Sequence, residues 1–179
     1  TAVQADGSWS VGITAAQVSA WPAGAVNIAV SGESSAGNPI SITHPVTVDL
    51  TPAAITINTI ATDDVINAAE KGANLTLSGT TTNVEAGQTV TVTFGGKNYT
   101  ASVAGDGSWT ATVPAADLAA LPEGSASAQA SVSNINGNSA SAVHSYSVDS
   151  SAPTIIINTV ASDNIVNASE ADAGVTVSG

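Results

Sequence analysis

Short runs in which hydrophobic and polar residues alternate follow one another through the middle of the chain, with turn residues between them. Seven such runs occur, at residues 54–61, 74–82, 88–96, 98–105, 108–114, 125–134 and 139–149. Alternation with a period of two is typical of strands that bury one face. Seven short strands within about a hundred residues predict an all-β, immunoglobulin-like β-sandwich. Residues 115–121, between Pro114 and Pro122, predict a single helical turn.

This pattern repeats itself with an offset of 100 residues. The stretch TINTIATDDVINAAE at 56–70 returns as IINTVASDNIVNASE at 156–170, and ADGSW at 5–9 returns as GDGSW at 105–109. A fixed period of this kind indicates tandem copies of one structural unit. We therefore expect a slice of a longer array: the C-terminal part of one repeat at residues 1–50, a complete repeat at 51–150, and the N-terminal strands of the next at 151–179.

The charge of the chain argues against several classes of partner. Fourteen acidic residues face two lysines and no arginine, which gives a formal net charge of −12 at pH 7. Such a field repels phosphate backbones and anionic membrane surfaces, so we expect no nucleic-acid partner. The absence of cysteine removes disulfides and thiolate metal sites. No apolar run reaches the length of about 18 residues that a membrane helix needs, so we expect no membrane insertion in this segment.

The acidic residues gather at the two ends of the predicted sandwich. Because antiparallel strands alternate in direction, the loops after odd-numbered strands lie at the end where the chain leaves the domain. Six acids fall at that end: Asp63, Asp64, Glu70, Asp117, Glu123 and Asp149. Glu85 and Asp106 fall at the opposite end, beside the asparagines of NING at 134–137. Since the next strand begins a few residues after Asp149, the acidic end of one repeat should meet the following repeat.

Carboxylates gathered in this way repel one another, and two lysines cannot neutralise them. Ca²⁺ takes six to eight oxygen ligands, whereas Mg²⁺ demands octahedral geometry and keeps several waters. The loop TDDVINAAE supplies an oxygen-only set, and positions that keep an oxygen in both copies are the best candidates. The predicted Ca²⁺ ligands are Asp49, Asp63, Asp64, Asn67, Glu70, Asp149, Asp163, Asn164, Asn167 and Glu170, and Asp6 and Asp106 form a second set.

Another interpretation of the same residues needs no metal. Asp and Asn favour turns and strand ends because their side chains bond to nearby backbone groups. We prefer calcium for the loop at 63–70 and for Asp149, and turn formation for Asp6 and Asp106, which lie in an ordinary hairpin turn. Besides Asp64, whose counterpart is Asn164, four acids face a non-acidic residue in the other copy, and these four are not predicted as ligands: Glu33, Asp117, Glu123 and Asp172.

At these residues the sequence resembles the bacterial immunoglobulin-like repeats of giant adhesins exported by type I secretion. The matching features are VDLTP at 48–52, VDSSAP at 148–153, the loop INTIATDDVINAAE, and GDGSW with the following LPEG. The resemblance covers essentially the whole chain. Two positions depart from it. The junction proline has moved to Pro52, so the first junction is expected to bend differently, and Asn164 replaces an acid, which is expected to weaken the loop of the third repeat.

The resemblance implies a structural stalk or spacer segment of an extracellular adhesin on a bacterial cell surface, active in cell adhesion and biofilm formation. It implies Ca²⁺ at the junctions, held by Asp49, Asp63, Asp64, Glu70, Asp149, Asp163, Asn164 and Glu170. The implied partners are neighbouring repeats of the same chain, with host or bacterial surfaces bound through other regions.

Catalysis is not expected. His44 and His144 recur in the last strand of each copy without an acid–base partner, no Gly-x-Ser-x-Gly motif occurs, and the junction acids lack the aromatic cleft of a glycosidase. Trp9 and Trp109 are predicted to fill the sandwich core, and Trp21 aligns with Leu121. The alternative function is a carbohydrate- or ligand-binding module, which an exposed Trp21 would favour.

Overall fold

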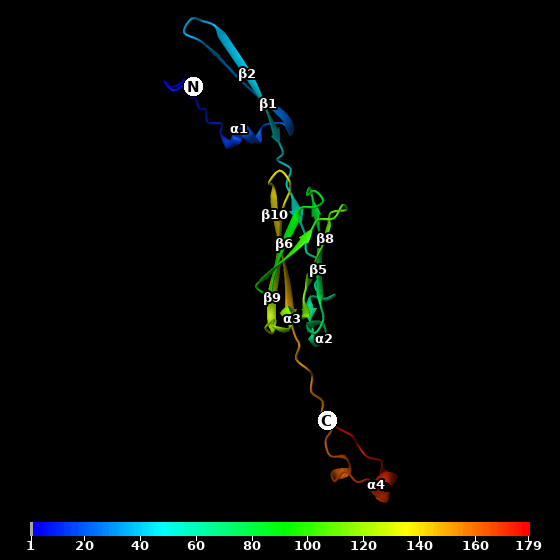
Figure 1. The fold of residues 1–179 in the computed structure, drawn as a ribbon. Helices are drawn as coiled ribbons and strands as arrows, with labels where there is room; N and C mark the ends of the chain where they lie inside the picture. The colour runs from blue at the N-terminus through cyan, green and yellow to red at the C-terminus, as the bar shows by residue number, and fades with distance from the viewer. Residues whose placement is uncertain (1) are drawn as a thin grey trace. The chain divides into compact units, whose positions relative to one another are not determined.

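A computed structural model describes residues 2–179, and most of its regular structure consists of strands (Figure 1). The elements in chain order are α1 (Ala15–Ser19), β1 (Gly24–Glu33), β2 (Pro39–Val48), β3 (Ala54–Ile55), β4 (Val65–Ile66), α2 (Ala68–Lys71), β5 (Leu75–Thr82), β6 (Thr89–Phe94), β7 (Lys97–Ser102), β8 (Ser108–Val113), α3 (Ala115–Ala119), β9 (Gly124–Ser133), β10 (Ser139–Val148), η1 (Val160–Ser162) and α4 (Ala168–Ala173). Within residues 2–179, no helix is long and apolar enough to cross a membrane.

These residues divide into two compact units. Unit 1 comprises the chain up to Asn58, Thr76–Thr112 and Ser127–His144. Unit 2 comprises Thr59–Leu75, Val113–Ala126 and Ser145–Gly179. Because β9 and β10 run through both units, each unit contains part of the sandwich.

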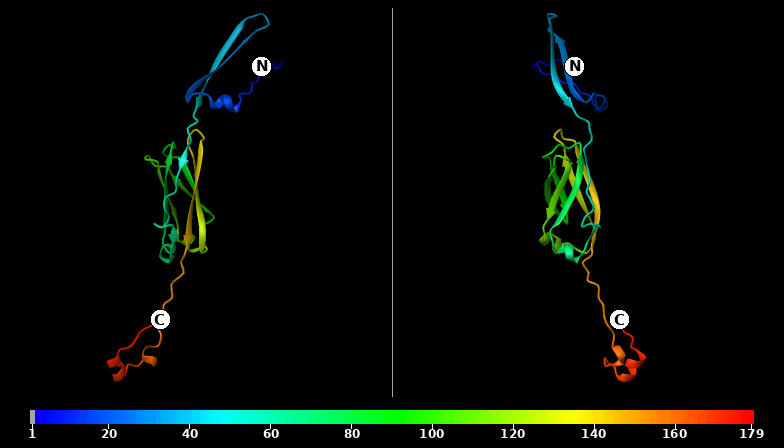
Figure 2. Two further views of the ribbon diagram at one scale, coloured as in Figure 1. Left: turned by 180° about the vertical axis from the view of Figure 1, so that it is seen from behind. Right: turned by 90° about the vertical axis from the view of Figure 1, so that its right-hand side faces the viewer.

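The structure confirms the predicted immunoglobulin-like β-sandwich. One sheet has five strands in the order β4-β10-β9-β6-β7, and a second has three in the order β3-β5-β8. β6 pairs antiparallel with β7, with Thr89 opposite Ser102 and Phe94 opposite Lys97. The view turned by 90° in Figure 2 shows the strands of the sandwich in two layers.

The alternating pattern fills the core of this sandwich. On β6, Val90, Val92 and Phe94 are buried while Thr89 and Thr93 face solvent. On β8 of the other sheet, Trp109 is only 1% exposed. Burial of these aliphatic side chains, together with Phe94 and Trp109, favours folding by removing apolar surface from water.

The segment predicted as a long first strand and a loop is folded differently. The ladder of β3 with β5 continues through the hydrogen bonds from Thr56 N to Thr80 O and from Asn58 N to Ser78 O, both 2.8 Å. The chain then turns, forms β4 parallel to β10, and enters α2. Asn67 and Glu70 form a capping box, which is a sequence signal for the beginning of this helix.

The predicted helical turn between the fifth and sixth predicted strands is confirmed as α3, in unit 2. Pro114 precedes its first residue, where the fixed backbone of proline and its missing N–H are tolerated. Leu118 is fully buried and anchors the turn.

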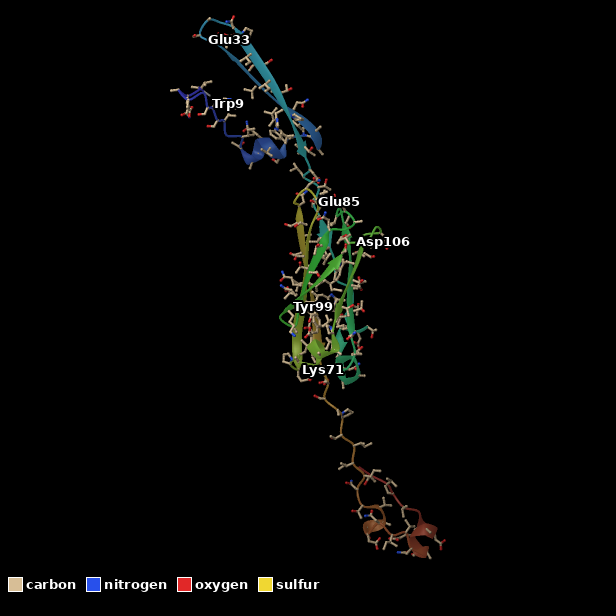
Figure 3. All side chains as sticks on the ribbon, viewed as in Figure 1. Trp9, Glu33, Lys71, Glu85, Tyr99 and Asp106 are labelled. Carbon is tan, nitrogen blue, oxygen red and sulfur yellow. The ribbon has the colours of Figure 1, made fainter. Side chains whose placement is uncertain are left out.

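The N-terminal residues form α1 and the hairpin β1–β2, in which Gly24 pairs with Val48 and Glu33 with Pro39. The prediction that Trp9 fills a core is wrong for this chain, because Trp9 is 45% exposed (Figure 3). Its counterpart Trp109 packs beside Gly79 of β5.

Residues 151–179, in unit 2, also contain a residue that is exposed although its counterpart is buried. Ile155 is 94% exposed, whereas its counterpart Ile55 is 7% exposed. Local structure is nevertheless kept: α4 begins at Asn167 with the same capping box as α2. Hence the local turn chemistry forms in both copies, whereas the burial of Ile55 is not repeated at Ile155.

Candidate functional site

The predicted grouping of the acids matches the two units. The six acids assigned to the end where the chain leaves the domain all lie in unit 2. Glu85, Asp106 and residues 134–137 lie in unit 1, and Glu85 and Asp106 lie in loops at the same end of the sandwich (Figure 3).

The loop at 63–70 lies against the end of β10 through backbone hydrogen bonds. Ser147 N donates to Asp64 O at 2.8 Å, and Asp149 N donates to Ile66 O at 3.0 Å. The parallel pairing of β4 with β10 therefore places Asp149 beside this loop, as the strand directions predicted.

The side chains of the first half of this loop hold its backbone. Asp63 Oδ1 accepts from Val65 N at 3.0 Å. Asp64 Oδ1 accepts from Ile60 N at 2.7 Å. Asp64 has φ of 65°, a left-handed conformation that costs free energy outside glycine, and these bonds hold it in place.

The second half of the loop is the capping box of α2. Asn67 Oδ1 accepts from Ala69 N at 2.9 Å and from Glu70 N at 3.1 Å. Glu70 Oε2 accepts from Asn67 N at 3.0 Å. Two of the predicted ligands thus satisfy backbone donors that a helix terminus would otherwise leave without partners.

The second copy repeats this conformation. Asp163 Oδ1 accepts from Ile165 N at 2.8 Å, and Asn167 and Glu170 form the equivalent cap. Asn164 has φ of 65°, and its Oδ1 accepts from Val160 N at 3.0 Å, as Asp64 does from Ile60. An amide oxygen performs this task as well as a carboxylate oxygen, which explains why position 64 can lose its charge in the next copy.

The donors of this loop suit Ca²⁺ chemically, because all are oxygens of carboxylates or amides. Their positions do not form a finished coordination site: within residues 2–179, no three His, Cys, Asp or Glu side chains come close enough together to hold a metal ion. The predicted ligands therefore remain a prediction, and their observed contacts are those of turn formation.

The second set of candidates occupies hairpin turns. Asp106 Oδ1 accepts from Ser108 N at 2.9 Å and from Ser108 Oγ at 2.7 Å, and Asp6 Oδ1 accepts from Ser8 N at 2.9 Å. Hydrogen bonds from the side chain and then the backbone of the serine lower the pKa of each carboxyl. These contacts are those that the turn interpretation predicted.

Asp49 meets residues 134–138 in unit 1. Its Oδ2 accepts from Asn136 Nδ2 at 2.7 Å, and its Oδ1 accepts from Thr51 N at 3.0 Å. The pKa of Asp49 is lowered from its ordinary value, chiefly because the Asn136 amide donates to the charged form and then because Thr51 does. The carboxylate is thus stabilised by nitrogen donors.

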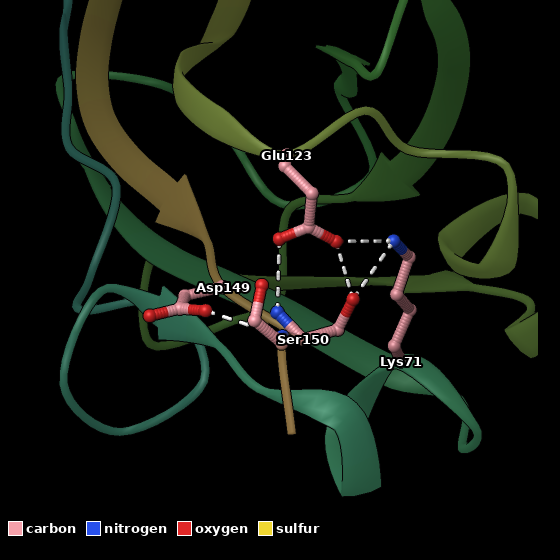
Figure 4. A network of polar contacts seen from close by, with 5 residues as sticks. Lys71, Glu123, Asp149 and Ser150 are labelled. Carbon is pink, nitrogen blue, oxygen red and sulfur yellow. Dashed lines mark hydrogen bonds and ion pairs between the residues drawn. The ribbon is translucent and has the colours of Figure 1, made fainter. Parts of the chain in front are cut away.

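An ionic network in unit 2 was not predicted from the sequence (Figure 4). Lys71 Nζ lies 3.1 Å from Glu123 Oε1 and donates to Ser150 Oγ at 3.3 Å. Ser150 donates to Glu123 through its backbone N, at 2.9 Å, and through its hydroxyl. The network ties α2 and the segment before β9 to Ser150, the first residue after the predicted ligand Asp149.

The residues of this network do not recur at the aligned positions of the other copies. Glu123 aligns with Ala23, Lys71 with Ala171 and Ser150 with Leu50, so comparison of the copies gave Glu123 no weight. A different signal was available: Lys71 is one of two lysines in a strongly acidic chain, and such a residue is expected to have a carboxylate partner.

The pKa of Glu123 is lowered from its ordinary 4.5 to about 2, first by the side-chain hydrogen bond from Ser150, then by its backbone N–H, and then by Lys71. A carboxyl whose pKa is lower in the folded state binds fewer protons there than in the unfolded chain. Its stabilising contribution is therefore complete above pH 4.5 and is lost as the pH falls towards 2. Because the Glu123 side chain is 49% exposed, solvent screening keeps this contribution small.

We expect Glu123→Gln to lower the melting temperature at pH 7, and we expect the difference from the parent chain to shrink as the pH falls from 4.5 to 2. Thermal melts followed by circular dichroism across this range measure it. Glu33 is exposed at the end of β1, and Glu33→Gln removes the same formal charge, so this variant serves as the control. A difference that is constant with pH, or equal for both variants, would contradict the assigned role of Glu123.

An exposed Trp21 would favour a carbohydrate- or ligand-binding module, but the structure does not expose this residue fully. Its side chain is partly buried, and its counterpart Leu121 is 8% exposed. This burial agrees with packing, which was the preferred interpretation of the residue.

Comparisons with known proteins found relatives among solved structures. No family model and no curated protein matches the chain. The chain is 34% identical to a Ca²⁺-stabilized adhesin that helps an Antarctic bacterium reach out and bind ice; this match covers 100% of this chain and 46% of that chain, with a TM-score of 0.49. It is 36% identical to a bacterial immunoglobulin-like domain from the M. primoryensis ice-binding adhesin, covering 55% of this chain and 99% of that chain, with a TM-score of 0.43.

A tetra-tandem repeat in the extending region of a large adhesion protein is 28% identical, with 82% of this chain and 37% of that chain covered and a TM-score of 0.45. The chain thus spans 46% of the first of these relatives. Because the chain is 36% identical to one such domain over 99% of that domain, it belongs to the bacterial immunoglobulin-like repeats found in large adhesins. This assignment rests on sequence identity and on the sandwich described above, and not on the TM-scores, which all lie below 0.5.

Proposed function

We propose that this chain is a spacer segment of a large bacterial surface adhesin, in which tandem immunoglobulin-like repeats hold an adhesive region away from the cell. The observation that carries the proposal is the combination of a repeat of 100 residues within the chain and 36% identity to an adhesin domain over 99% of that domain. One of the relatives is itself a tandem repeat in an extending region.

The proposed partners are the neighbouring repeats of the same chain, and the surfaces that the adhesin contacts are bound by other regions. The proposed location is extracellular, on the bacterial surface, after type I secretion, and the proposed biological role is cell adhesion and biofilm formation. The net charge of −12 agrees with a spacer that binds neither nucleic acid nor anionic lipid.

We further propose that Ca²⁺ binds where a repeat ends, at the loop of residues 63–70 and Asp149. Three observations support this: the oxygen-only donors, the backbone bond that places Asp149 beside Ile66, and the calcium-stabilized relative. A bound ion would relieve the repulsion between the carboxylates and would stabilise the folded state by mass action.

Small-angle scattering of the 179-residue chain, with calcium and with excess chelator, tests this function. We expect chelation to increase the radius of gyration and to broaden the distribution of distances, while circular dichroism keeps the strand signal of the sandwich. Magnesium in place of calcium serves as the control, because the proposed ligands suit the larger ion. Identical profiles in all three solutions would contradict a calcium-dependent junction.

A further inference from the structure

The loop between β9 and β10 is fixed by a buried asparagine. Asn134 is 5% exposed, and its Oδ1 accepts from Asn136 N at 3.1 Å and from Asn138 N at 2.9 Å. Gly137 N donates to Asn134 O at 3.1 Å and Gly137 has φ of 91°, a conformation that favours glycine. These hydrogen bonds hold the loop in one conformation, in which the side chains of Asn136 and Asn138 both reach Asp49.

Both of these amides bond to Asp49, which lies just past the end of β2. Asn136 Nδ2 donates to Asp49 Oδ2 at 2.7 Å, and Asn138 Nδ2 donates to the Asp49 carbonyl oxygen at 3.1 Å. Because Thr51 N donates to Oδ1, all three oxygens of Asp49 accept a bond from nitrogen. A hydrogen bond to a charged acceptor is about twice as strong as one between neutral groups.

A further asparagine holds the connector two residues later. Asn83 Nδ2 donates to Pro52 O at 2.8 Å. Asn134 Nδ2 in turn reaches Asn83 O at 3.4 Å, and Glu85 Oε2 accepts from Ile135 N at 2.9 Å. The loop after β5 and the loop after β9 thus hold each other and the connector of residues 49–52.

We propose that Asn83, Asn136 and Asn138 form a docking site for the connector of the preceding repeat, and that this site fixes the junction without a metal ion. A cation at Asp49 would have to compete with the N–H donors that already bond to each of its oxygens. The docking site gives Asp49 a role other than the predicted metal ligand, and it does not depend on the calcium proposed at residues 63–70.

The first copy supports a binding role for Asn136. Its loop has the same conformation: Ser34 N donates to Asn38 O at 2.9 Å, and Gly37 N donates to Ser34 O at 2.9 Å. In that loop Ala36 occupies the position of Asn136. The Asn136 side chain is therefore not needed to form the loop, and its contribution lies in the bond to Asp49.

Spin labels test the docking site. Because the sequence has no cysteine, Thr47→Cys and Ser133→Cys place labels at two exposed sites, one on β2 before the connector and one on β9 before the loop. In excess EDTA we expect a narrow distribution of distances between the labels. Asn136→Ala should lose this narrow peak, and Asn136→Asp should lose it as well, because two carboxylates would then face each other.

Asn27→Ala, an exposed asparagine on β1, is the matched control and should keep the narrow peak. Unchanged melting curves for Asn136→Ala, as the alanine in the first copy predicts, exclude misfolding as the cause. A broad distribution in EDTA that narrows with calcium, and narrows at lower calcium in Asn136→Asp, would overturn the proposal and make Asp49 and residue 136 metal ligands. A narrow peak that survives Asn136→Ala would also overturn it.

Discussion

Replacing Trp109 by alanine is expected to lower the free energy of unfolding of the sandwich by about 3–5 kcal/mol. The indole is 1% exposed in the core of unit 1, so its removal forfeits the transfer free energy of a large side chain and leaves a cavity. Urea unfolding followed by circular dichroism measures the change, since the other two tryptophans complicate fluorescence.

Trp9→Ala is the matched control for this experiment. Trp9 follows the same turn as Trp109 in the first copy but is 45% exposed. We expect its replacement to lower the free energy of unfolding by less than that amount, because Trp9 buries less of its surface than Trp109 does and leaves no fully enclosed cavity. Equal losses for the two variants would mean that the N-terminal residues form a packed core.

Gly79→Ala is expected to cost at least the amount usual for overpacking, about 1–3 kcal/mol. Gly79 lies on β5, where an added Cβ would strike the Thr56 carbonyl oxygen and lie 2.6 Å from Cζ2 of Trp109. Because the first of these neighbours is backbone, the β3–β5 ladder would have to shift. A lower midpoint of thermal unfolding reports this effect.

Gly105→Ala is the control for the glycine experiment. An added Cβ there would meet nothing within 4 Å, and its backbone is not left-handed. We expect a change within about 0.5 kcal/mol, as for most surface substitutions. If Gly79→Ala were equally harmless, β5 would lie further from Trp109 than the structure places it.

Much of the sandwich could be predicted because its strands alternate strictly. On β6 and β8, the residues expected to point inward are the buried ones, and the helical turn expected between Pro114 and Pro122 is found at Ala115–Ala119. The exposure of Trp9 could not be predicted from the residues around it in the sequence. Local pattern sets which face of a strand is apolar, whereas burial depends on strands distant in sequence.

The chemistry of the acids was predicted less completely, because one residue type serves several purposes. Strand direction correctly placed Asp149 beside the loop that contains β4. It did not reveal that Asp64 and Asn164 share a backbone-capping task, or that Glu123 pairs with Lys71. A carboxylate that recurs in two copies is consistent with both metal binding and turn formation, and only its contacts separate the two.

The two interpretations of the loop acids are compatible in one molecule. A carboxylate has two oxygens and about four acceptor positions, and Asp63 and Glu70 are each seen to use one oxygen for the turn. Calcium could therefore bind to a loop that is already shaped by its own hydrogen bonds. In that case, removing the charge while keeping an acceptor should abolish binding and leave the turn intact.

Calorimetric titration of the chain with calcium tests whether the ion binds at residues 63–70 and Asp149. The parent is compared with a variant that carries Asp63→Asn, Glu70→Gln and Asp149→Asn. These changes keep an oxygen acceptor at each position, as Asn164 does in the next copy. We expect saturable binding in the parent, loss of that binding in the variant, and similar melting temperatures for the two in chelator. An absence of binding in the parent, or equal binding in both, would contradict it and leave the recurring acids as turn formers alone.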